Sequence, residues 1–188
     1  MSHKRLYRNI LISALILFLW AAAAWAVGDG LDLAGTSDGK YTVTYYPSDV
    51  SRADLVKMLN MRASGGILAG VPSGGDELSR LLDTLYIQVS DILAIHLYSL
   101  KINIKICRDI TQLKDIYRRM FNVDLGPRQS FYVYNSNTIY VSREGFRREI
   151  VGHEMAHAII SHYFVVPAPV KIQEILAMYA EYQLRQFN

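Results

Sequence analysis

The sequence of 188 residues predicts a single compact domain of the α+β class, with helices packed beside a small sheet. Apolar residues recur at spacings of three and four between Asp76 and Tyr98, which predicts one long amphipathic helix. Short β-prone runs follow this helix, and two further helical segments end the chain. Helices and strands that are grouped along the chain, and do not alternate regularly, are typical of this class.

The first 26 residues predict an export signal. A basic start precedes an unbroken apolar run, Ile10 to Trp20, and the run ends in Ala24-Trp25-Ala26. This small-x-small ending is typical of signal-peptidase sites, so we expect cleavage before Val27 and a periplasmic or secreted protein. The alternative is an uncleaved N-terminal membrane anchor or tether through residues 10–27, because about 18 apolar residues are near the minimum that spans a bilayer.

Charge and cysteine usage exclude several classes of function. The chain has 20 basic and 17 acidic residues, but Lys4, Arg5 and Arg8 lie in the export signal, so the mature chain is neutral. A neutral chain offers no electrostatic basis for binding nucleic acid. Cys107 is the only cysteine, so it cannot form an intramolecular disulfide, and we expect it to be buried and inert.

The first half of the mature chain contains a tether, a strand and two helices. Residues 27–40 are rich in Gly, Asp, Ser and Thr and are expected to be a flexible tether, with the domain covering residues 41–188. Tyr41 to Tyr46 is β-prone, and Ser48 or Ser51 can begin a helix through Leu59. Ser64 to Gly75 holds five glycines and is expected to be a connecting loop. His96 continues the apolar stripe of the long helix and is expected in the core.

The second half predicts a small sheet and three helices. Alternation in Ile102 to Ile106 indicates a strand, and Asn135-Ser136-Asn137 between two β-prone runs indicates a hairpin. The hairpin strands are Ser130 to Tyr134 and Thr138 to Val141. The predicted helices are Thr111 to Phe121, Arg147 to Tyr163 and Val170 to Gln186.

The chemistry is indicated by His153-Glu154-Met155-Ala156-His157. Residues four apart lie on one face of a helix, so the imidazoles of His153 and His157 can bind the same zinc ion. Glu154 projects beside them, where it can accept a proton from a zinc-bound water without binding the metal. The surrounding helix is largely apolar, and buried imidazoles and carboxylates need partners such as a metal.

A catalytic zinc ion needs a third protein ligand, and Glu174 on the next helix is the first candidate. The segment from Pro169 through Glu174 and Ala177 to Tyr179 resembles the Pro-Arg-Trp-x-x-Glu-Gly-Leu-Ala-x-Tyr segment of peptidase-MA-like gluzincin metallopeptidases. In that family a glutamate on a helix after the zinc-binding helix completes the site. Lys171 and Ile175 replace the family's Trp and Gly. Glu181 and His162 are alternative third ligands.

Hydrolysis also needs groups that activate and bind the substrate. A hydrogen-bond donor must stabilise the developing oxyanion, and Tyr163 and Tyr179 are the expected catalytic donors, with Tyr182 and His162 as alternatives. Zincins bind peptide along an edge strand, which implies that Phe131 to Tyr134 or Thr138 to Val141 pairs with the substrate backbone.

The sequence therefore predicts a zinc metallopeptidase that holds one Zn²⁺ per chain and acts on a peptide or protein substrate. The alternative from another class is a non-catalytic, zinc-stabilised exported binding module, because the motif looks the same in both. A transmembrane helix over residues 76–98 is disfavoured, since Asp83, Asp91 and His96 interrupt it. The oligomeric state and the cleavage specificity stay open.

Overall fold

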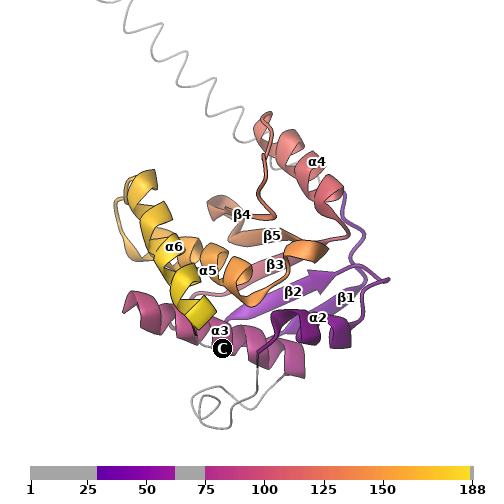
Figure 1. Ribbon diagram of the computed structural model, residues 1–188, viewed down its shortest axis with the longest axis horizontal. Coiled ribbons are helices and arrows are strands. Elements are labelled where there is room, and N and C mark those ends of the chain that lie inside the picture. The colour runs from indigo at the N-terminus through magenta and orange to yellow at the C-terminus, as the bar shows by residue number, and fades with distance from the viewer. Residues whose placement is uncertain (1–28, 62–74, 187–188) are drawn as a thin grey trace, which may run out of the picture.

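A five-stranded mixed sheet forms the centre of the molecule (Figure 1), in a computed structural model that describes residues 29–61 and 75–186. The strands are β1 (Gly35–Asp38), β2 (Thr42–Tyr46), β3 (Ile102–Cys107), β4 (Ser130–Val133) and β5 (Thr138–Ser142). Their order in the sheet is β1-β2-β3-β5-β4. The three inner strands are parallel, and β1 and β4 are antiparallel edge strands. The predicted α+β class is confirmed.

The two faces of the sheet carry cores of different size. Alternation along β3 directs Ile102, Ile104 and Ile106 into the larger core, whereas Cys107 lies in the smaller one. Side chains of α2 (Arg52–Leu59), α3 (Glu77–Leu93), α5 (Arg148–Tyr163) and α6 (Val170–Gln186) fill the larger core. Helix α4 (Ile110–Phe121) covers the opposite face (Figure 1). The site residues on α5 and α6 thus stand on the more heavily packed face.

The helices begin and end largely where side-chain chemistry predicts. Ser51 and Asp76 each accept a hydrogen bond from the backbone N–H three residues later, which begins α2 and α3. Helix α3 ends at Leu93, because Ala94 adopts a left-handed conformation with φ 53°. The prediction of a helix to Tyr98 was therefore too long. His96 lies beyond this end and is exposed, so its expected place in the core was wrong.

Residues 29–40 are part of the domain and not the flexible tether that their polar composition predicted. Gly35–Asp38 forms β1 and pairs with β2. Asp29 accepts hydrogen bonds from Lys105 and Tyr140. The carboxylate of Asp83 accepts bonds from the backbone N–H groups of residues 40–42. Composition misled here because several of these polar groups, including Asp29, Ser37 and Asp38, have polar partners elsewhere in the fold.

Close packing of α6 against α5 places the two helices that carry the motif residues. Ala177 and Ala180 on α6 are fully buried, and Gly152 on α5 faces Leu184. A Cβ atom on Gly152 would lie 2.2 Å from Leu184 Cδ1, so a larger residue there would require the Leu184 side chain to move. The sequence indicated the role of Ala177 but not that of Gly152.

The predicted export signal (1–26) and most of the predicted loop Ser64 to Gly75 lie outside the described residues. Among residues 29–61 and 75–186, no helix is long and apolar enough to cross a bilayer.

Candidate metal centre

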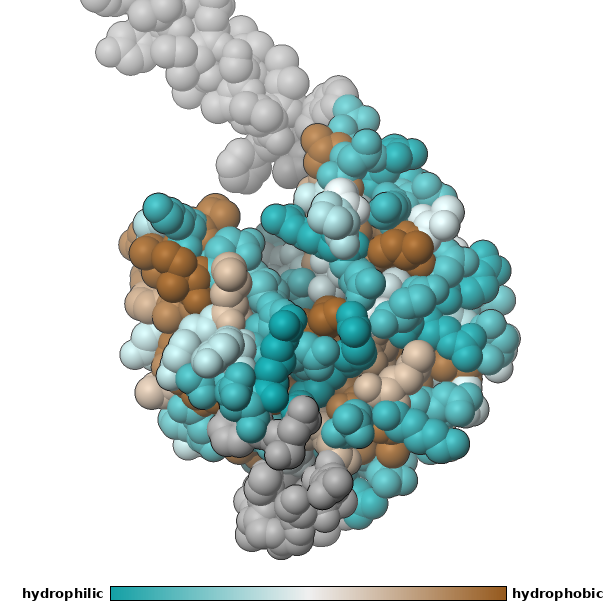
Figure 2. All heavy atoms as spheres, viewed as in Figure 1, coloured by the Kyte–Doolittle hydropathy of each residue, from teal (hydrophilic) through white to brown (hydrophobic). Residues whose placement is uncertain are grey.

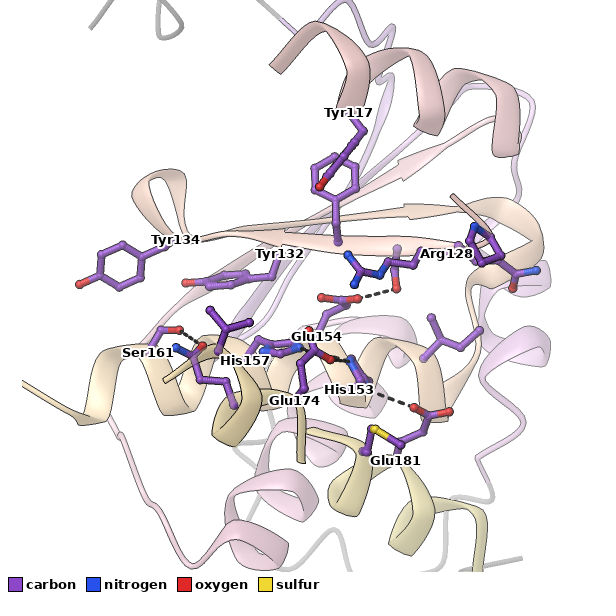
Figure 3. A pocket seen from close by; sticks show the side chains of 18 of the residues that line it. Tyr117, Arg128, Tyr132, Tyr134, His153, Glu154, His157, Ser161, Glu174 and Glu181 are labelled. Carbon is purple, nitrogen blue, oxygen red and sulfur yellow. Dashed lines mark hydrogen bonds and ion pairs between the residues drawn. The ribbon is translucent and has the colours of Figure 1, made fainter. Parts of the chain in front are cut away.

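The two histidines of α5 project from one face of the helix and nearly touch (Figure 3). The distance between His153 Nε2 and His157 Nε2 is 3.2 Å. Two nitrogens bound to one tetrahedral zinc ion at ordinary bond lengths lie about 3.3 Å apart. The histidine pair is thus already at the spacing that one shared ion requires.

Glu174 from α6 completes a three-ligand group. Its Oε2 atom lies 3.7 Å from His153 Nε2 and 3.8 Å from His157 Nε2. Among the described residues, His153, His157 and Glu174 form a group that can hold a metal ion. The carboxylate needs to move only a few tenths of an ångström to reach tetrahedral spacing.

The alternative third ligands occupy other positions. Glu181 Oε2 lies 3.0 Å from His153 Nδ1, on the side of the ring opposite the candidate metal position, and it also pairs with Arg185. An ionised carboxylate only accepts hydrogen bonds, so this contact places the proton of His153 on Nδ1 and leaves the Nε2 lone pair free. His162 Nδ1 lies 2.9 Å from the carbonyl oxygen of Ala158 and does not join the group.

The environment of His157 keeps its imidazole neutral, as a metal ligand must be. Burial, reinforced by repulsion from His153, lowers the pKa of His157 from 6.5 to about 4. Only 15% of its side chain is exposed. Its ring is therefore unprotonated across the physiological pH range.

Glu154 is buried beside the histidines and has one polar partner, Ser130 at the start of β4. The Ser130 hydroxyl donates a hydrogen bond of 2.7 Å to Glu154 Oε1. Burial raises the pKa of the Glu154 carboxyl above 4.5, while the Ser130 hydrogen bond and His153 act in the opposite direction. A carboxylate with a raised pKa, adjacent to a metal site, is a suitable proton acceptor near neutral pH.

These groups lie in an open cleft of about 840 Å³. Figure 2 shows the surface hollowed between α6 and the α4 side of the molecule. The tyrosines that line the cleft are Tyr117, Tyr132 and Tyr134. Tyr163 and Tyr179, the expected oxyanion donors, do not line it, and each side chain is about half exposed. The structure therefore does not bring these two residues to the site.

The sheet offers one of the two predicted substrate strands to the cleft. β4 pairs only with β5, so its outer edge is free of strand partners among the described residues. β5 lies between β3 and β4 and cannot pair with a substrate, so the alternative over Thr138 to Val141 was wrong.

The sequence did not indicate Ser130 and Arg128, which both line the cleft. Ser130 bonds to Glu154, and Figure 3 shows Arg128 near that carboxylate. A usable signal existed for Ser130. Side chains alternate along a strand, so a strand over Ser130 to Tyr134 places Ser130, Tyr132 and Tyr134 on one face, and a hydroxyl on that face can meet a helix packed against it. Arg128 follows Gly126 and Pro127 in a loop, and no periodic pattern indicated its direction.

Comparisons with protein-family models, curated proteins and solved structures find no match for this chain. Its function is therefore inferred from the site.

Proposed function

We propose that the protein is a zinc-dependent metallopeptidase that hydrolyses peptide bonds in a peptide or protein substrate. The observation that carries this proposal is the juxtaposition of three metal-ligating side chains with Glu154. His153, His157 and Glu174 converge from two helices, and the carboxylate of Glu154 is buried beside them. A site that only stabilised the fold would have no need of a fourth, non-ligating carboxylate held in place by a hydroxyl.

The donor set favours zinc over other common ions. Two imidazoles and one carboxylate suit zinc, whereas magnesium and calcium prefer sites made of oxygen ligands. Three protein ligands leave one position open, which is the arrangement of catalytic zinc sites. When bound there, zinc would lower the pKa of a coordinated water and polarise the carbonyl of a substrate.

Glu154 supplies the proton transfer in this proposal. Its raised pKa favours uptake of a proton from the attacking water, and the same proton can then pass to the leaving amine. The hydrogen bond from Ser130 fixes one carboxylate oxygen and leaves the other free to face the metal site. Glu181 orients His153 through Nδ1 and so supports the ligand without touching the reacting atoms.

The edge of β4 gives a substrate backbone a place to pair. An extended peptide added beside β4 would lie along the cleft that Ser130 and Tyr132 line. Backbone pairing would position the scissile carbonyl without demanding one side chain, and it places the substrate next to Glu154.

The decisive test separates metal binding from hydrolysis. In the zinc-loaded protein, Glu154→Gln should keep the metal and lose peptide hydrolysis by roughly a hundredfold or more, the scale of a lost general base. Glu144→Gln is the matched control, because Glu144 is exposed in the turn before α5 and does not line the cleft. The assay measures cleavage of a mixed peptide library together with zinc content.

Two results would contradict the proposal. If Glu154→Gln cleaves as fast as the wild-type protein, Glu154 is not the base. If the zinc-loaded wild-type protein cleaves no peptide, the chain is better described as a zinc-stabilised binding module.

A further inference from the structure

The acidic groups that line the cleft already have partners. Glu154 accepts a hydrogen bond from Ser130, and Glu174 faces the histidine pair. Glu181 is shared by His153 and Arg185. These carboxylates are therefore occupied by the site itself.

Of the two arginines that line the cleft, one is hydrogen-bonded and one is not. Arg147 donates to Gln129 and lies 3.9 Å from Glu149. Arg128 makes no hydrogen bond or close ion pair with any residue of the described ranges 29–61 and 75–186, although its charge acts on the nearby Glu154 carboxyl and lowers the pKa of that group. Figure 3 shows its side chain pointing into the cleft, toward Glu154. A guanidinium presents several donors in a fixed plane, which suits a carboxylate.

The backbone holds Arg128 in this place. Leu125 is buried and anchors the loop before Arg128, and the ring of Pro127 fixes the backbone φ angle of the residue directly before Arg128. Immediately after it, the carbonyl oxygen of Gln129 accepts a hydrogen bond of 2.9 Å from Ser142 N–H. The guanidinium therefore extends from the loop two residues before β4, the edge strand on which a substrate would pair.

An aromatic wall lies on the same side of the cleft. The rings of Tyr117 and Phe131 are 4.9 Å apart, and those of Tyr117 and Phe121 are 4.7 Å apart. All three residues line the cleft, and Phe121 is 45% exposed. This wall offers an apolar contact next to a positive charge.

We propose that Arg128 binds a carboxylate of the substrate, with an adjacent apolar side chain against Tyr117, Phe121 and Phe131. The carboxylate is either the C-terminus of the peptide or an acidic side chain. The inference rests on the proposed function, since it assigns a specificity to the same cleft. Binding of this carboxylate by Arg128 makes the protein selective for acidic peptides, or for residues near a free C-terminus.

A binding measurement tests this inference independently of hydrolysis. The zinc-loaded full chain carrying Glu154→Gln is immobilised and exposed to a mixed-sequence peptide library in which half of the peptides have free C-termini and half are amidated. We expect at least tenfold stronger retention of peptides that carry the recognised carboxylate, the scale of a charge-assisted hydrogen-bonded pair. Preference for free acids over amides identifies the C-terminus. Preference for Asp and Glu over Asn and Gln among amidated peptides identifies a side chain.

Variants of Arg128 show whether this residue is responsible. Arg128→Gln should abolish the preference, and Arg128→Glu should reverse it toward peptides that contain lysine. Arg108→Gln, a surface arginine that does not line the cleft, is the matched control and should leave it intact. Unchanged thermal unfolding midpoints would show that each variant folds.

Three results would overturn the inference: no retention of any peptide, equal retention of peptides with and without carboxylates, or a preference that survives Arg128→Gln. The proposed function fails by a different result. If the wild-type protein cleaves nothing but the Arg128-dependent preference is present, hydrolysis is refuted and the carboxylate site stands.

Discussion

Burial of His157 makes a quantitative prediction for the metal-free protein. Its pKa is lowered from 6.5 to about 4 in the folded chain, so between these values the unfolded chain binds more protons than the folded one. The contribution of neutral, buried His157 to the free energy of unfolding is therefore fully present above pH 6.5 and is lost as the pH falls toward 4. A shift of one pKa unit corresponds to about 1.4 kcal/mol, so the lost stability amounts to about 3 kcal/mol.

The perturbation that isolates this effect is His157→Leu, which removes the titrating group and keeps the site apolar. Groups that do not interact with His157 titrate alike in both proteins and cancel in the comparison. Zinc is removed with a chelator, because proton release on metal binding would add its own pH dependence. Urea unfolding at intervals from pH 7.5 to pH 4 gives the free energy of unfolding of each protein.

We expect the wild-type protein to lose about 3 kcal/mol more than His157→Leu between pH 6.5 and pH 4. Parallel curves for the two proteins, or a smaller loss in the wild type, would contradict this expectation. Either result would mean that His157 is accessible to protons and is not held neutral for a metal.

Three further predictions concern the support of the site and the N-terminus. Ser130→Ala removes a hydrogen bond that lowers the pKa of Glu154, so the acid limb of the pH profile of kcat/KM should move to higher pH. An acid limb at the same pH would show that the hydroxyl does not tune the pKa of the base. Glu181→Gln should weaken zinc binding about tenfold to a hundredfold in a chelator competition, since His153 loses its orienting partner, and unchanged affinity would exclude that role. N-terminal sequencing of the exported protein should begin at Val27, whereas an intact N-terminus found only in membranes would favour an anchor.

The sequence alone was sufficient to predict the site residues whose relative positions are set by helical periodicity. His153 and His157 are one helical turn apart, so any helix over this segment brings their rings together. Glu174 was identified by its resemblance to a family motif, and the structure brings it to the histidines. Its alternative, Glu181, lies about two turns further on the same face and reaches the other ring nitrogen of His153.

The sequence was insufficient where the site depends on how elements pack together. Tyr179 is five positions after Glu174, about 140° around the helix, so it points away from the cleft that Glu174 faces. Ser130 bonds to Glu154, and Arg128 lies near it, only because β4 is the edge strand beside α5, and the order of strands is not encoded in any local pattern. The polar segment that contains β1 looked like a tether for the same reason, because its partners lie on β2, α3 and the inner strands.

Elemental analysis of the purified protein shows whether His153, His157 and Glu174 bind one zinc ion. After zinc-replete purification and dialysis, the wild-type chain should contain one zinc per chain. His157→Ala and Glu174→Gln should contain substantially less, while Glu154→Gln should match the wild type. A wild-type chain without metal, or a His157→Ala chain that retains a full equivalent, would contradict the account.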